Sequence, residues 1–129
     1  MLSRRLYIST TDAIGHYLFR GMATEPIALE ELKRFSELRP REDSKSMFVA
    51  ISSHDGRVEL RRTPTGQWTA RITAASHREQ MLWGLLPARE AMIWEPDDLA
   101  EDEARRIVSM LFTLPREAFT QRVAAEMAA

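Results

Sequence analysis

The fold class of this chain follows from residues 46–83, SMFVAISSHDGRVELRRTPTGQWTARITAASHREQMLW. Two tight-turn signals, His54-Asp55-Gly56 and Thr63-Pro64-Thr65-Gly66, divide this stretch into three strand-like runs. The runs cover residues 46–52, 57–63 and 67–73. Strands joined by tight turns pair antiparallel. The sequence therefore predicts an α+β fold with an antiparallel β-meander of three to five strands.

The second turn also fixes the register of the hairpin that it closes. Pro64 stands at the second turn position and Gly66 at the fourth, which indicates a type I turn with a glycine bulge. In this register Thr63 pairs with Gln67, and Glu59 lies opposite Arg71. One face of the hairpin is then apolar, with Val58, Leu60, Trp68, Ala70 and Ile72. The other face carries Arg57, Glu59, Arg61, Thr69 and Arg71.

The first turn leaves two registers open. It can close as a two-residue Asp-Gly turn or as a three-residue bulged turn, and the difference of one residue exchanges the faces of strand 46–52. We favour the Asp-Gly turn, because it adds Val49 and Ile51 to the apolar side, and Phe48 then points outward. In both registers large apolar side chains reach both faces, which is typical of a strand that is covered on both sides. We therefore expect a helix or a binding partner on the second face.

Helix signals precede the sheet. The residues Ser9-Thr10-Thr11-Asp12 favour a helix N-terminus, and the helical spacing of Ile14, Tyr17, Leu18 and Met22 predicts a first helix that ends near Gly21. Thr24-Glu25-Pro26 predicts a second helix that ends before Pro40. Leu6-Tyr7-Ile8 is a short possible strand ahead of them.

Two or three further helices are expected after the sheet. Ser76-x-x-Glu79 is a capping box that predicts a helix ending near Pro87. Residues 91–94 favour a strand, although a helix is also compatible with them. The acidic residues from Asp97 onward and Pro115 predict the starts of the last two helices.

Composition bounds the class of protein. The 129 residues are 44% hydrophobic and 29% charged, which is typical of a single globular domain, here 1–129. The absence of cysteine excludes disulfides and cysteine-based metal sites. No apolar run has the length of a signal peptide or a membrane span, so we expect a cytoplasmic protein. The preference for Arg over Lys and the lack of Asn indicate a bacterial or phage coding sequence.

The net charge of −1 conceals an asymmetry along the chain. Residues 1–44 are neutral, residues 45–94 carry a net charge of +3, and residues 95–129 carry −4. The basic sheet region and the acidic tail can face each other or face separate partners.

Catalytic, metal and cofactor motifs are not apparent. Asp12 and His16 are four residues apart and would share one face of the first predicted helix, and His54 lies in a turn. Neither has a second group that completes a site, and the five isolated glycines form no phosphate-binding loop. We therefore assign no catalytic residue, no metal ligand and no cofactor.

The strongest candidate surface is the arginine-bearing face of the sheet. Arg57 and Arg61 lie on this face, whereas Arg62 is expected to cover Trp68 from the other side. The two apolar faces of strand 46–52, together with the lack of a convincing active site, predict a non-enzymatic protein that binds another protein, acts as an inhibitor module or forms a homodimer. Its candidate contact residues are Arg57, Arg61, Arg62 and an outward Phe48. Two alternatives stay open. One is a nucleic-acid binder that uses Arg57, Arg61 and Arg62, and the other is a small enzyme with His16 or His54.

Overall fold

The computed structural model describes residues 4–39, 46–52, 56–82 and 86–128, which form one six-stranded antiparallel sheet and three helices. In chain order the elements are β1 (Leu6–Thr11), β2 (Tyr17–Ala23), α1 (Glu25–Ser36), β3 (Met47–Ser52), β4 (Gly56–Arg62), β5 (Trp68–Leu82), β6 (Leu86–Trp94), α2 (Glu101–Thr113) and α3 (Arg116–Ala128). The strand order across the sheet is β2-β1-β3-β4-β5-β6. The predicted α+β class with an antiparallel sheet is confirmed. The sheet has more strands than expected, and one helix precedes β3 instead of two.

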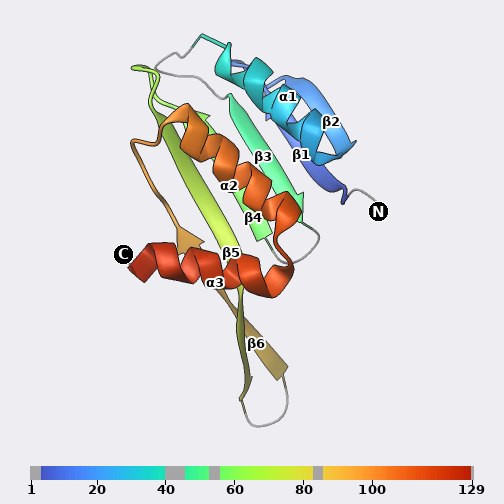
Figure 1. Cartoon of the computed structure of the whole chain (residues 1–129), viewed down its shortest axis with the longest axis vertical. Helices are drawn as coiled ribbons and strands as arrows, with labels where there is room; N and C mark the ends of the chain where they lie inside the picture. Colours follow the sequence, from blue (N-terminus) through green and yellow to red (C-terminus); the bar gives the residue numbers. More distant parts are fainter. Residues whose placement is uncertain (1–3, 40–45, 53–55, 83–85, 129) are drawn as a thin grey trace.

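All three helices lie on one side of the sheet (Figure 1). Helix α1 packs on β1, β2 and β3, α2 packs on the central strands, and α3 crosses β4, β5 and β6. The core between the two layers includes Phe35 of α1, Phe48 of β3, Leu60 of β4, Ile72 of β5 and Val108 of α2, which are all fully buried. Removing these side chains from water is the main source of stability for such a two-layer fold.

The predicted helices at 24–39 and in the C-terminal region are confirmed. Pro26 occupies the first turn of α1, where its missing N–H costs nothing. Three acidic residues fill the first turn of α2 and face the positive end of its dipole. Among the described residues, no helix is long and apolar enough to cross a membrane.

The helix predicted after Asp12 is wrong, because this segment forms a turn and strand β2. The backbone N–H of Gly15 donates to Asp12 O at 3.1 Å, and Asp12 N–H donates to His16 O at 2.8 Å. The turn at Thr63 repeats this pattern, with Gly66 N–H to Thr63 O and Thr63 N–H to Gln67 O, both at 2.8 Å. Gly15 and Gly66 both have φ +86°, the left-handed conformation that the bulge requires. The glycine three residues after Asp12 was therefore a hairpin signal.

The predicted helix after Ser76 is also wrong. Strand β5 continues to Leu82 and pairs antiparallel with β6, with a register shift between Ala75 and Glu79. In Figure 1 the far end of this hairpin extends beyond α3. Pairing along two long strands provides hydrogen-bond partners for the backbone N–H and C=O groups of this segment. The local capping signal therefore does not decide its structure. Residues 91–94 belong to β6, which confirms their expected strand.

The favoured register of β3 is wrong, and the alternative faces are the ones observed. Phe48 pairs with Leu60, Ala50 with Val58, and Ser52 with Gly56. Directly paired residues point to the same side of a sheet, so Phe48 and Ala50 face the helices. Met47, Val49 and Ile51 consequently lie on the opposite side.

Candidate functional site

The outer face of the sheet is the side that faces away from the helices. According to the strand register, the side chains on the outer face form an apolar group and a charged group. The apolar group consists of Tyr7, Met22, Met47, Val49, Ile51 and Ile93. The charged group consists of Arg20, Arg57, Glu59, Arg61, Arg71 and Glu95. Val49 is buried, yet it does not belong to the core cluster between sheet and helices. Its neighbours on the sheet therefore bury it, since no described helix covers this face.

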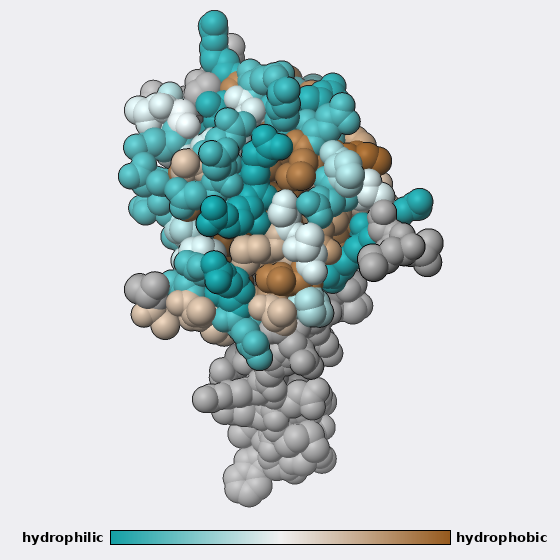
Figure 2. Space-filling model, in the orientation of Figure 1, coloured by the Kyte–Doolittle hydropathy of each residue, from teal (hydrophilic) through white to brown (hydrophobic). Residues whose placement is uncertain are grey.

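The helix side of the molecule has a different character. Figure 2 looks onto this side and shows a mainly hydrophilic surface with small, separate apolar spots. Such a surface is typical of one that stays in water. The outer face is therefore the better candidate for a binding surface.

Ion pairs neutralise part of the charge on the outer face. Arg57 Nε lies 2.7 Å from Glu59 Oε1, within the same strand. Glu59 lies opposite Arg71 in the strand register, which confirms the predicted pairing. The ion pair of Arg71, however, is with Glu95, whose Oε1 lies 3.8 Å from Arg71 Nε. Arg61 makes no ion pair with any described residue. Arg61 is thus the arginine on β4 whose charge stays free for a ligand.

A depression with a volume of about 440 Å³ surrounds Arg61 on the outer face. Its lining residues are Glu59, Arg61, Thr69, Ala70, Arg71, Glu95, Pro96 and Asp97. The strands β4 and β5 form its floor, and residues 95–97 form one wall. Backbone hydrogen bonds hold this wall in place, because Ala70 N–H donates to Pro96 O and Leu99 N–H donates to Trp68 O, both at 3.0 Å.

The wall is the part of the site that sequence reasoning missed. The sequence pattern interprets Asp97 only as part of an acidic helix start, and no local motif indicates that Glu95 and Asp97 lie beside arginines of β4 and β5. The extension of the β5 pairing up to Leu99 brings them there. The depression therefore combines two guanidinium groups with three carboxylates.

Arg62 serves the interior and not the outer face. Its Nη1 donates to Ser36 O at 2.8 Å and to Leu38 O at 2.7 Å, which satisfies carbonyls at the C-terminal end of α1. Its guanidinium carbon lies 5.6 Å from the centre of the Trp68 ring, which confirms the expected cover. Phe48 is fully buried beneath the helices. The structure thus places Arg57 and Arg61 together and separates Arg62 and Phe48 from them.

The histidine candidates do not form a described site. Asp12 Oδ1 accepts hydrogen bonds from the backbone N–H groups of Ile14, at 3.1 Å, and His16, at 2.8 Å. This carboxylate therefore holds the β1–β2 turn, which replaces the predicted helix face. His54 lies outside the described residues. Across residues 4–39, 46–52, 56–82 and 86–128, no three His, Asp or Glu side chains are grouped to hold a metal ion.

The chain matches no protein-family model, no curated protein and no solved structure.

Proposed function

We propose that this chain is a non-enzymatic protein-binding module, and that its partner docks on the outer face around Arg61. The observation that carries this proposal is the one-sided placement of the helices, which leaves apolar and charged residues of the sheet in contact with solvent. A protein interface needs this combination, an apolar centre with a polar rim that fixes the orientation of the partner.

The distribution of charge favours a protein over a nucleic acid. Glu59, Glu95 and Asp97 line the same depression as Arg61 and Arg71, and these carboxylates would repel a phosphate backbone. A protein surface can supply a carboxylate to Arg61 and a basic group to Asp97 at the same time. Trp68 is also buried and packs 5.5 Å from Phe35, so its ring does not offer a stacking platform for bases.

The chemistry of the lining favours binding over catalysis. The residues around the depression include no histidine, serine or lysine, and the hydroxyl of Thr69 lies among arginines and carboxylates. Nucleophilic catalysis requires a nucleophile beside a general base. The described lining therefore supports recognition of charged groups.

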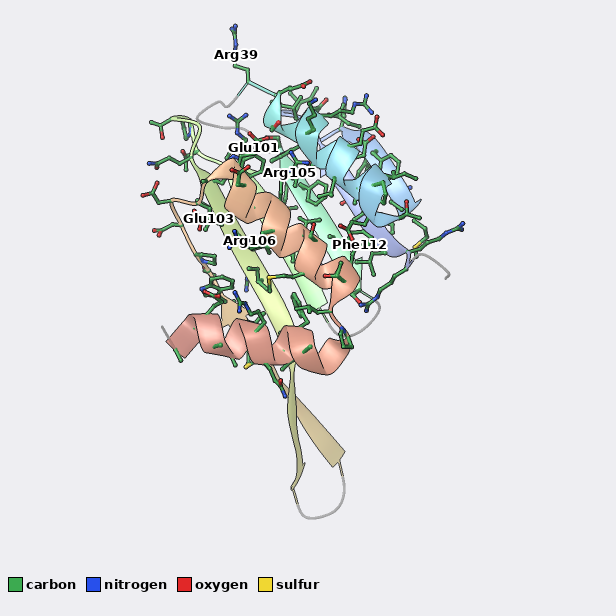
Figure 3. All side chains as sticks on the ribbon, viewed as in Figure 1. Arg39, Glu101, Glu103, Arg105, Arg106 and Phe112 are labelled. Carbon is green, nitrogen blue, oxygen red and sulfur yellow. The ribbon has the colours of Figure 1, made fainter. Side chains whose placement is uncertain are left out.

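The experiment uses a photo-crosslinking amino acid at Thr69 on the outer face, and the matched control carries it at Arg105 on α2. Figure 3 shows that Arg105 projects from the helix side of the molecule. We expect crosslinks to one defined protein from position 69 and not from position 105. Arg61→Glu should abolish the crosslinks, because it reverses the free charge, whereas Arg106→Glu on α2 should leave them unchanged.

Other results would contradict the proposal. Equal crosslinking from both positions, or insensitivity to Arg61→Glu, would mean that the outer face does not select the partner. Salt-dependent binding to DNA or RNA that Arg61→Glu removes would favour the nucleic-acid alternative instead.

A further inference from the structure

We propose that a second copy of this chain docks along β2, by antiparallel pairing of the two β2 strands into one continuous twelve-stranded sheet. Among the described residues, strand β2 is an edge of the sheet, and its hydrogen-bonded neighbour is β1. A free edge presents unpaired N–H and C=O groups that pair readily with another strand. This site is separate from the depression around Arg61, which lies on β4 and β5.

Exposed apolar side chains gather at this edge. Seven large hydrophobic residues are exposed in the described part of the chain, and five of them belong to β2, to the turn before it or to the first turn of α1. These five are Ile14, Tyr17, Leu18, Met22 and Ile27, with exposed fractions between 43% and 66%. The remaining two, Ile93 and Met127, lie in β6 and α3. A free strand edge and an apolar surface thus coincide in one place.

A second copy fits this edge because the geometry is self-complementary. Antiparallel pairing of identical strands uses a two-fold axis perpendicular to the sheet, which keeps the helices of both copies on the same side. Helix α1 then lies beside α1 of the other copy. Ile27 extends the contact on the helix side, and Met22 extends it on the outer face. Each seven-residue strand finds a partner of equal length.

One like-charged contact lies at the two-fold axis of this pairing. Arg20 is the one charged residue of β2, and full pairing places it opposite Arg20 of the other copy, which weakens the association. The guanidinium carbon of Arg20 lies 4.7 Å from the centre of the Tyr17 ring of its own strand, and this cation–π contact offsets part of that cost. At roughly 200 Å² per large side chain, the five exposed residues offer about 500 Å² of surface. Standard interfaces bury about 800 Å² per partner, and the paired main chains supply much of the difference.

The test measures self-association of the full chain by sedimentation velocity over a range of protein concentrations. We expect a monomer–dimer equilibrium in the unmodified chain. Met22→Lys and Tyr17→Lys place a charge at the paired edge, and each should raise the dimer dissociation constant about tenfold or more. Both residues are exposed, so the fold itself is retained, which circular dichroism verifies.

Ile93→Lys and Met127→Lys are the matched controls, because they introduce the same charge at exposed apolar positions elsewhere. We expect the dimer to tolerate them. Hydrogen exchange gives a second readout, in which the amides of β2 gain protection as the protein concentration rises. A chain that stays monomeric at every concentration would overturn the proposal. So would a dimer that Ile93→Lys weakens and Met22→Lys does not, since that pattern indicates pairing through the outer face.

Discussion

Gly56, the first residue of β4, lies directly beneath side chains of the two C-terminal helices. A Cβ atom added at this position would lie 2.8 Å from Leu111 Cδ1 and 3.0 Å from Phe119 Cε1. Carbon atoms in contact are normally about 3.5–4.0 Å apart. Gly56→Ala therefore forces the side chains of Leu111 and Phe119, or the helices that carry them, to shift by roughly 0.5–1 Å, because pairing with Ser52 and Ala74 holds Gly56 on both sides.

The size of the effect follows from two opposing contributions. Forcing an extra methyl group into a packed core costs about 1–3 kcal/mol. Because Ala restricts the unfolded chain more than Gly does, the lower entropy of the unfolded state offsets about 0.4–1 kcal/mol of this cost. We expect a net loss of about 1–2 kcal/mol in the free energy of unfolding. For a chain of this size that corresponds to a fall of roughly 3–8 °C in Tm.

Urea unfolding followed by tryptophan fluorescence measures the loss, and a double-mutant cycle with Leu111→Ala tests its cause. Leu111→Ala alone should cost about 2–5 kcal/mol. With Leu111 shortened, Gly56→Ala should cost less by at least ~0.5 kcal/mol, because one of the two close contacts is gone. If Gly56→Ala leaves stability unchanged, or if the two changes add without coupling, the close approach does not control the packing here.

Three further predictions concern stability, and urea unfolding checks the first two. Arg62→Ala should lower the free energy of unfolding by about 2–3 kcal/mol, because it removes two charged hydrogen bonds at the end of α1. Arg61→Ala is the control and should change it by less than ~0.5 kcal/mol. Thr10→Val should raise the free energy of unfolding by up to ~1 kcal/mol, since the buried Thr10 hydroxyl has no hydrogen-bond partner among the described residues. A clear fall in the free energy of unfolding would contradict this reasoning. Asp12→Ala should cost about 1 kcal/mol and accelerate hydrogen exchange at the His16 amide, because the β1–β2 turn loses its carboxylate acceptor. Unchanged exchange at His16 would refute the last prediction.

The parts of the fold that could be predicted depend on short-range chemistry. Pro64 and Gly66 specify their turn and thereby the whole register of β4 against β5, which the structure reproduces. The apolar stripe of α2, from Ala104 to Phe112, is buried as its spacing indicates. In these segments the local preference and the tertiary environment agree.

The errors arose where a local signal had two meanings. Asp12 is a good helix N-cap residue, but the same carboxylate can accept the N–H groups of a tight turn, as it does here. Ser76 and Glu79 form a valid capping box in sequence, although their segment pairs with β6. A cap contributes about 1 kcal/mol, which is less than a long strand gains from continuous pairing.

Local sequence patterns established the antiparallel α+β class, the β4–β5 hairpin and the last two helices, because turn residues and periodicity act over a few neighbours. The face of β3 that meets the helices depends on tertiary contacts, since a one-residue slip exchanges the faces at almost no local cost. The three-dimensional fold provides that information. It also decided that β2 is an edge and that Glu95 and Asp97 lie beside Arg61. These features depend on contacts between segments distant in sequence, and the free energy of those contacts comes from burial and pairing across the whole sheet.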